Sequence, residues 1–203
     1  MSNYITNHYQ FSYPSSYEDK IIELASEKEE LLEVVENYLG LVCDFKIDYE
    51  LVEEGEYLID FDHKKLVYPL EYLSELEHYD DLMLVVTSLL GKEVNFFILL
   101  GFVDYLSHLL EEKDYYETIN KYLINGEYLE ITSLIKLKKY REEDVPIVIN
   151  EAGAFVNYLI YYYGYPSFLR YYQGEAFKHV YGVDLKTMEK RFVFKYMGNE
   201  LEF

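Results

Sequence analysis

The spacing of the apolar residues changes at Pro69, and this change limits the chain to a mixed α and β architecture. Before Pro69, short segments alternate in the manner of strands at residues 8–13, 43–52, 57–62 and 65–68, with a long helical pattern between the first two. After Pro69, apolar residues recur three and four positions apart almost to the end of the chain. The sequence therefore predicts an α+β fold, in which a small, mainly antiparallel N-terminal sheet with a helix precedes a mostly helical C-terminal part.

The predicted elements fall into two lobes, residues 1–69 and residues 70–203, which we expect to form a single domain. Half of the 203 residues are apolar or aromatic, which is enough to build a substantial core. In the second lobe, the helix predicted over residues 146–163 contains Ala152, Gly153 and Ala154. Three consecutive small residues allow another helix to approach closely.

The chain is strongly acidic, with 38 acidic and 18 basic residues and a formal net charge of -20 at pH 7. This charge disfavours nucleic-acid phosphates and anionic lipid as direct partners, and it favours a protein partner, in particular a basic one. The first residues lack a basic segment followed by an apolar stretch, and no uncharged apolar run of about 18 residues occurs. We therefore expect a cytoplasmic protein. The single cysteine, Cys43, excludes an internal disulfide.

Three segments, at residues 7–52, 82–91 and 150–192, together resemble the gluzincin-like peptidase domain, the group of HExxH zinc metallopeptidases that includes thermolysin. The opening of small members is similar to NHYQFSYPSSYEDKIIELASEKEELLEVVENYLGLVCDFKIDYELV. The later turns of the helix that normally carries HExxH resemble LMLVVTSLLG. The final helices of the family resemble NEAGAFVNYLIYYYGYPSFLRYYQGEAFKHVYGVDLKTMEKRF, which is the most specific of the three matches. The resemblance implies a gluzincin-like fold over most of the chain.

The zinc site of that family needs two histidines four residues apart, a glutamate after the first as general base, and a further glutamate from the next helix. The resemblance places the five motif positions at Asp80, Asp81, Leu82, Met83 and Leu84. A register that begins at His78 keeps one histidine, but it puts Tyr79 at the base and Leu82 at the second ligand. Leu100, which precedes Gly101 in ILLGFVDYL, stands where the third ligand would be.

Because these ligands are missing, we expect no catalytic residue, no bound metal and no cofactor. The degenerate positions of the former site are Asp80, Asp81, Leu84 and Leu100. The preferred interpretation is a non-catalytic pseudo-metallopeptidase domain that acts as a protein-binding or regulatory module. The former cleft is then either filled by apolar side chains or reused for protein contacts, with His78, Asp104 and Tyr105 as the residues available for reuse.

Two alternatives come from other functional classes. In the first, the acidic surface mimics a nucleic acid and inhibits a basic protein partner, which requires carboxylates arranged along one face. In the second, the chain is a metallopeptidase-like hydrolase whose site residues have moved elsewhere in the sequence.

Overall fold

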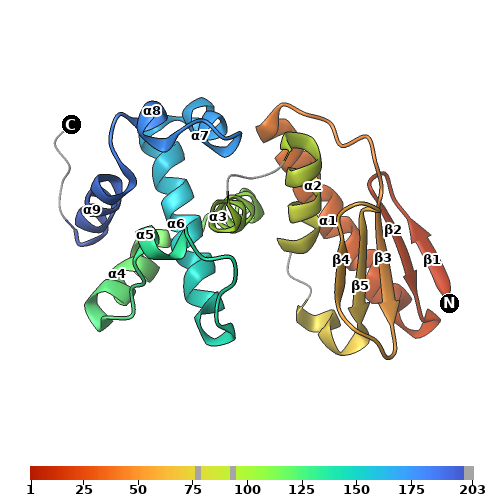
Figure 1. Ribbon diagram of the computed structural model, residues 1–203. Helices are drawn as coiled ribbons and strands as arrows, with labels where there is room; N and C mark the ends of the chain where they lie inside the picture. The colour runs from red at the N-terminus through yellow and green to blue at the C-terminus, as the bar shows by residue number, and fades with distance from the viewer. Residues whose placement is uncertain (76–78, 92–94, 199–203) are drawn as a thin grey trace. The chain divides into compact units, whose positions relative to one another are not determined.

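The computed structural model describes residues 1–75, 79–91 and 95–198, and these residues confirm the α+β class (Figure 1). The chain separates into two compact units, Met1–Leu89 and Leu90–Phe203. A five-stranded sheet lies in the first unit, and the second unit is built from helices. No helix of the described ranges is long and apolar enough to cross a lipid bilayer.

The first unit contains, in chain order, β1 (Ser2–Ile5), β2 (Tyr9–Tyr13), the short 3-10 helix η1 (Ser15–Tyr17), α1 (Glu18–Leu39), β3 (Ile47–Val52), β4 (Leu58–Asp60), β5 (Lys65–Pro69), the 3-10 helix η2 (Leu70–Glu75) and α2 (Tyr79–Leu90). The strand order in the sheet is β1-β2-β3-β5-β4. The two outer pairs, β1 with β2 and β4 with β5, are antiparallel, and the two inner pairs are parallel.

The sheet is therefore mixed, which corrects the expectation of a mainly antiparallel sheet. Strands β2 and β3 are parallel because the connection between them, which includes α1, is long enough to return the chain to the end of the sheet at which β2 began. The second parallel pair arises because β4 lies outside β5, so that β5 and not β4 is the neighbour of β3.

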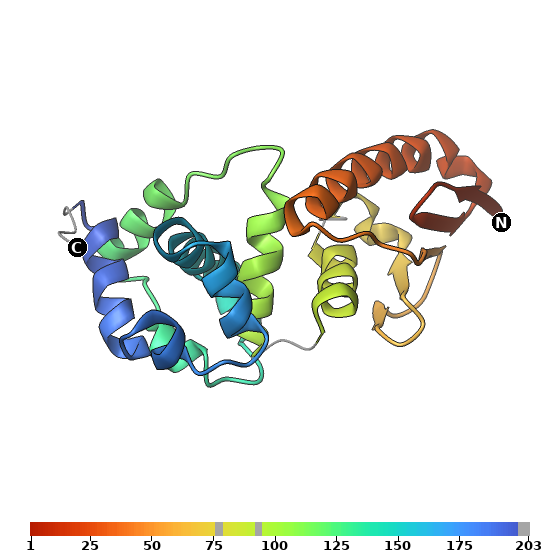
Figure 2. The ribbon, with the colours of Figure 1, turned by 90° about the horizontal axis from the view of Figure 1, so that it is seen from above.

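One face of the sheet is packed against α1 and α2 (Figures 1 and 2). The alternation along β2 turns Tyr9, Phe11 and Tyr13 inward, and all three are buried. Leu84 and Val85 of α2 join the same core. Helix α2 consequently packs with the sheet through Leu84, Val85 and Leu89. The sequence places the boundary between the lobes after Pro69, whereas the first unit extends to Leu89.

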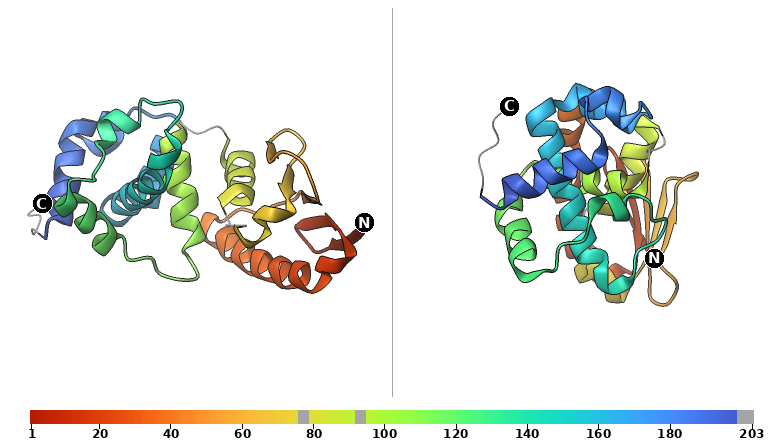
Figure 3. Two further views of the ribbon diagram at one scale, coloured as in Figure 1. Left: turned by 90° about the horizontal axis from the view of Figure 1, so that it is seen from below. Right: turned by 60° about the vertical axis from the view of Figure 1, so that its left-hand side comes forward.

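The second unit contains α3 (Phe96–Ser107), α4 (Tyr115–Asn125), α5 (Ile131–Leu134), the 3-10 helix η3 (Glu142–Asp144), α6 (Val145–Tyr163), α7 (Tyr165–Tyr172), α8 (Phe177–Tyr181) and α9 (Leu185–Tyr196). Helix α6 runs through the middle of this unit and contacts α3, α4, α5 and α7 (Figure 3).

Helices α3 and α6 approach closely because each has a glycine at the contact. An ideal Cβ on Gly101 would lie 2.3 Å from the carbonyl oxygen of Ala152, and one on Gly153 would lie 1.9 Å from the Asp104 carboxylate. Neither distance is compatible with a side chain. The small residues of α6 therefore admit another helix, as their sequence predicts.

Candidate functional site

Asp81, at a position that the sequence resemblance aligns with the HExxH motif, belongs to a buried polar cluster in the first unit. One carboxylate oxygen, Oδ1, accepts a hydrogen bond from Lys28 Nζ at 3.1 Å, and Oδ2 accepts one from the Tyr9 hydroxyl at 2.9 Å. The Lys28 Nζ also lies 5.2 Å from the centre of the Tyr49 ring. All four side chains are buried. Asp81 thus joins α2 to α1 and to the sheet, and both of its oxygens are already bonded inside the protein.

Asp80 and Leu84 have different surroundings from Asp81. The Asp80 carboxylate accepts hydrogen bonds from the Tyr68 and Tyr57 hydroxyls. Burial raises the pKa of Asp80 above its ordinary value, against the lowering effect of those two bonds. Leu84 is fully buried in the sheet core. Three of the sequence-predicted positions therefore lie on α2, where they support the packing of the first unit.

Asp104, on α3 of the second unit, is also buried and doubly bonded. Lys113 Nζ donates to Oδ1 at 2.7 Å, and the Tyr115 hydroxyl donates to Oδ2 at 2.8 Å. On the same helix, Leu100 is half-buried, and the ring of Tyr105 stacks on Phe102 with 6.5 Å between centroids. Asp104 thus anchors the segment that leads into α4.

The sequence-predicted positions are distributed over both units. Asp80, Asp81 and Leu84 lie in the first unit, and Leu100, Asp104 and Tyr105 lie in the second. His78 lies outside the described residues. Within residues 1–75, 79–91 and 95–198, no three side chains of His, Cys, Asp or Glu are grouped so that they could hold a metal ion. The absence of zinc from the protein stays a prediction.

The acidic charge is unevenly divided between the units. Residues 1–89 include 21 acidic and 5 basic residues, a formal charge of -16, whereas residues 90–203 include 17 acidic and 13 basic residues, a charge of -4. The sequence shows this asymmetry once the charged residues are counted on either side of residue 89.

Much of this charge follows the outer face of α1. Five exposed residues recur there at intervals of three and four, which places them on one side of the helix. We call them the α1 carboxylate row: Asp19, Glu23, Glu27, Glu30 and Glu33. None of the five pairs with a basic side chain among the residues that the structure describes. The row extends from Asp19 to Glu33, a rise of about 21 Å along the helix axis.

Comparison with known proteins identifies no relative of this chain. No protein-family model, curated protein or solved structure matches this chain significantly. The similarity to gluzincin-like peptidases stays a prediction that rests on the chain's own segments, and any functional argument depends on the residues themselves.

Lys28, the partner of Asp81, is not among the residues predicted from the sequence, although the sequence contains a signal for it. Lys28 occurs on the buried stripe of α1 together with Ile21, Ala25 and Leu32. A lysine on such a stripe needs a buried acidic partner, because an isolated charge is costly in the core. The pattern predicts that a partner exists, but it does not indicate which of the 38 acidic residues supplies it.

Proposed function

We propose that this chain is a non-catalytic binding module that binds a basic segment of another protein along the outer face of α1. The observation that carries the proposal is the α1 carboxylate row, which lies in a unit of formal charge -16. This proposal unites the pseudo-peptidase interpretation with the acidic-mimic alternative. The scaffold positions Asp81 and Leu84 serve packing, and the acidic surface provides the contact.

The electrostatics of the row favour a cationic partner. Successive carboxylates are about 4.5 to 6 Å apart along the helix axis, which is less than the screening length of about 8 Å at physiological ionic strength. Their charges therefore repel one another in the free protein. A partner that places lysine or arginine side chains along the row removes this repulsion, and its association is accelerated by the long-range field.

The spacing also explains why a nucleic-acid-binding protein is a suitable kind of partner. One strand of a duplex presents one phosphate charge per about 3.4 Å of axis, the same order as the interval in the row. A groove that follows a phosphate backbone would find a comparable line of negative charge on α1. The proposal covers basic protein segments generally, and a nucleic-acid-binding groove is one member of that class.

The experiment is a fluorescence titration of an alternating lysine-alanine peptide with three forms of the full chain. The first is the native protein, and the second is the row variant Glu23→Gln/Glu27→Gln/Glu30→Gln. The third is the loop variant Glu53→Gln/Glu54→Gln/Glu56→Gln, which makes the same change in net charge at exposed residues of the same unit.

We expect the row variant to weaken peptide binding about tenfold and the loop variant to change it less than about twofold, because screening confines the loop charges to their own neighbourhood. Raising the salt concentration should weaken binding to the native protein more than to the row variant. Equal losses of peptide affinity in the two variants would mean that binding depends only on the net charge of the protein, which contradicts a docking face on α1.

A further inference from the structure

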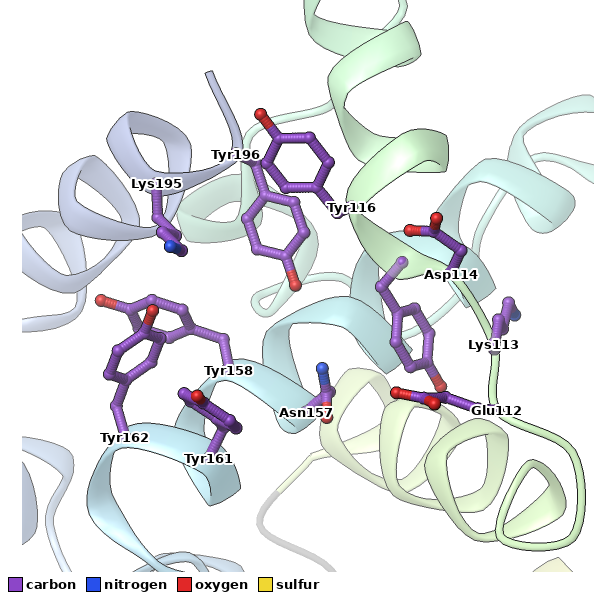
Figure 4. A pocket seen from close by; sticks show the side chains of 11 residues that line it. Glu112, Lys113, Asp114, Tyr116, Asn157, Tyr158, Tyr161, Tyr162, Lys195 and Tyr196 are labelled. Carbon is purple, nitrogen blue, oxygen red and sulfur yellow. The ribbon is translucent and has the colours of Figure 1, made fainter. Parts of the chain in front are cut away.

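The second unit contains a pocket of about 540 Å³ between α4, α6, α9 and the segment that precedes α4 (Figure 4). Its walls are largely tyrosine rings, contributed by Tyr116, Tyr158, Tyr161, Tyr162 and Tyr196. The volume lies within the range of about 300 to 1,000 Å³ that is typical of small-molecule sites. The pocket is separate from the α1 carboxylate row, and what it binds does not depend on the proposed function.

One end of the pocket is suited to an anionic group. Lys195, in the last turn of α9, is half-buried and forms no ion pair with an acidic residue in the part of the chain that the structure describes. At the same end lies Tyr158 (Figure 4), whose hydroxyl is buried and has no hydrogen-bond partner among the described residues. Burial raises the pKa of Tyr158, so the hydroxyl keeps its proton at neutral pH. Lys195 therefore supplies the cationic donor at this end, which suits a carboxylate.

The opposite end of the pocket has the opposite charge. Glu112 and Asp114 lie there, on the far side of the rings from Lys195 (Figure 4), and both are exposed. Lys113 lies between them in sequence, but its charge is compensated by the buried Asp104, with 2.7 Å between Nζ and Oδ1. The remaining carboxylates leave this end negative, which suits an ammonium group.

The rings between the two ends provide an aromatic surface. Tyr158 and Tyr162 lie with centroids 4.7 Å apart, and Tyr161 contacts Tyr162 edge-on at 4.9 Å. Tyr161 is 77% exposed, so its ring is available to a ligand. Tyr116 and Tyr196 stack at 5.9 Å on another side of the pocket. An aromatic ring of a ligand would pack against these faces and gain both burial and ring contacts.

We infer that the pocket binds a small aromatic zwitterion of the amino-acid class in which the ring separates the ammonium group from the carboxylate. Its carboxylate binds at Lys195, its ammonium group binds at Glu112 and Asp114, and its ring packs among the tyrosines.

Calorimetric titration of the full chain with 4-(aminomethyl)benzoate, 4-(2-aminoethyl)benzoate and 4-(aminomethyl)phenylacetate, in which the ring lies between the two charged groups, tests this inference. We expect at least one of them to bind, and its analogues without the amino group or without the carboxylate to bind at least tenfold more weakly. No binding of any of the three at concentrations up to about 10 mM would overturn the inference. Equal binding of the amino acid and both analogues would overturn the zwitterion assignment.

Two variants locate the binding site. Lys195→Met should weaken binding of the amino acid and leave the analogue without a carboxylate unaffected, whereas Glu112→Gln should spare the analogue without an amino group. Lys190→Met, at an exposed position of the same helix, is the matched control and should change nothing. Full amino-acid binding in both Lys195→Met and Glu112→Gln would place the ligand elsewhere and refute the site. Circular dichroism and the melting temperature of each variant show whether the fold is retained.

Discussion

Glu151, on α6, gives the most quantitative test of the helical unit. The side chain is fully buried, Oε1 accepts a hydrogen bond from the backbone N–H of Leu129 at 2.8 Å, and Oε2 has no hydrogen-bond partner among the described residues. Burial raises the pKa of Glu151 from 4.5 to about 8, and the negative charge of Glu189 adds to the increase against the Leu129 hydrogen bond. The folded protein therefore holds this carboxyl protonated at neutral pH.

The pH dependence follows from the difference in proton binding between the two states. Between pH 4.5 and about 8 the folded state binds the Glu151 proton and the unfolded state has lost it, so the free energy of unfolding falls as the pH rises through this window. The difference between the two pKa values corresponds to at most about 5 kcal/mol, at about 1.4 kcal/mol per pH unit. Below pH 4.5 Glu151 is protonated in both states and does not lower the free energy of unfolding. Above about pH 8 it lowers that free energy by the full amount.

The substitution Glu151→Gln keeps an acceptor for the Leu129 N–H and removes the titration. We expect the variant to gain stability relative to the native protein between pH 5 and pH 9, with the largest gain at pH 9 and an upper limit of about 5 kcal/mol. Urea denaturation at several pH values measures the difference, and Glu142→Gln, at an exposed position, is the control. A stability difference that stays constant from pH 5 to pH 9 would refute the assignment of a buried, protonated Glu151.

Three other predictions concern packing and metal. Asp81→Ala leaves the Lys28 ammonium group buried without its carboxylate, and we expect the free energy of unfolding to fall by about 3 to 5 kcal/mol in urea denaturation; a loss below about 1 kcal/mol would contradict a buried ion pair. Gly153→Ala places a methyl group against Asp104, which should cost at least about 1 to 3 kcal/mol, and an unchanged melting temperature would contradict the close helix contact. Elemental analysis of purified protein should find no stoichiometric zinc, and a chelator should leave the melting temperature unchanged; zinc at one equivalent would refute this expectation.

The sequence is most informative about the helices and their buried faces. The periodicity after Pro69 predicts a helical second part, and the small residues around Gly153 predict the close contact that α6 makes with α3. These features are local in the sequence, because the residues that form the buried face of a helix lie three and four positions apart. The strand pairing is not local. Neither the parallel neighbours of β3 nor the packing of α2 on the sheet can be inferred from segments that pair across long connections.

The candidate sites are predictable only in part for the same reason. Asp81 and Asp104 were singled out from the sequence, but their partners Lys28 and Tyr115 come from other elements and become visible only in the folded chain. The tyrosine pocket combines α4, α6 and α9, each of which looks in sequence like an ordinary packed helix. The α1 carboxylate row, in contrast, could be read from helical spacing alone, because all of its members lie on one helix.

The proposal that the outer face of α1 binds a basic segment is tested most directly by locating the bound lysine-alanine peptide. Backbone amide chemical shifts of the full chain, recorded during the titration, report which residues respond. The proposal predicts that the largest changes occur between residues 19 and 33 of α1 and disappear in the row variant. Changes spread evenly over the acidic residues of both units, or confined to a surface other than α1, would contradict it.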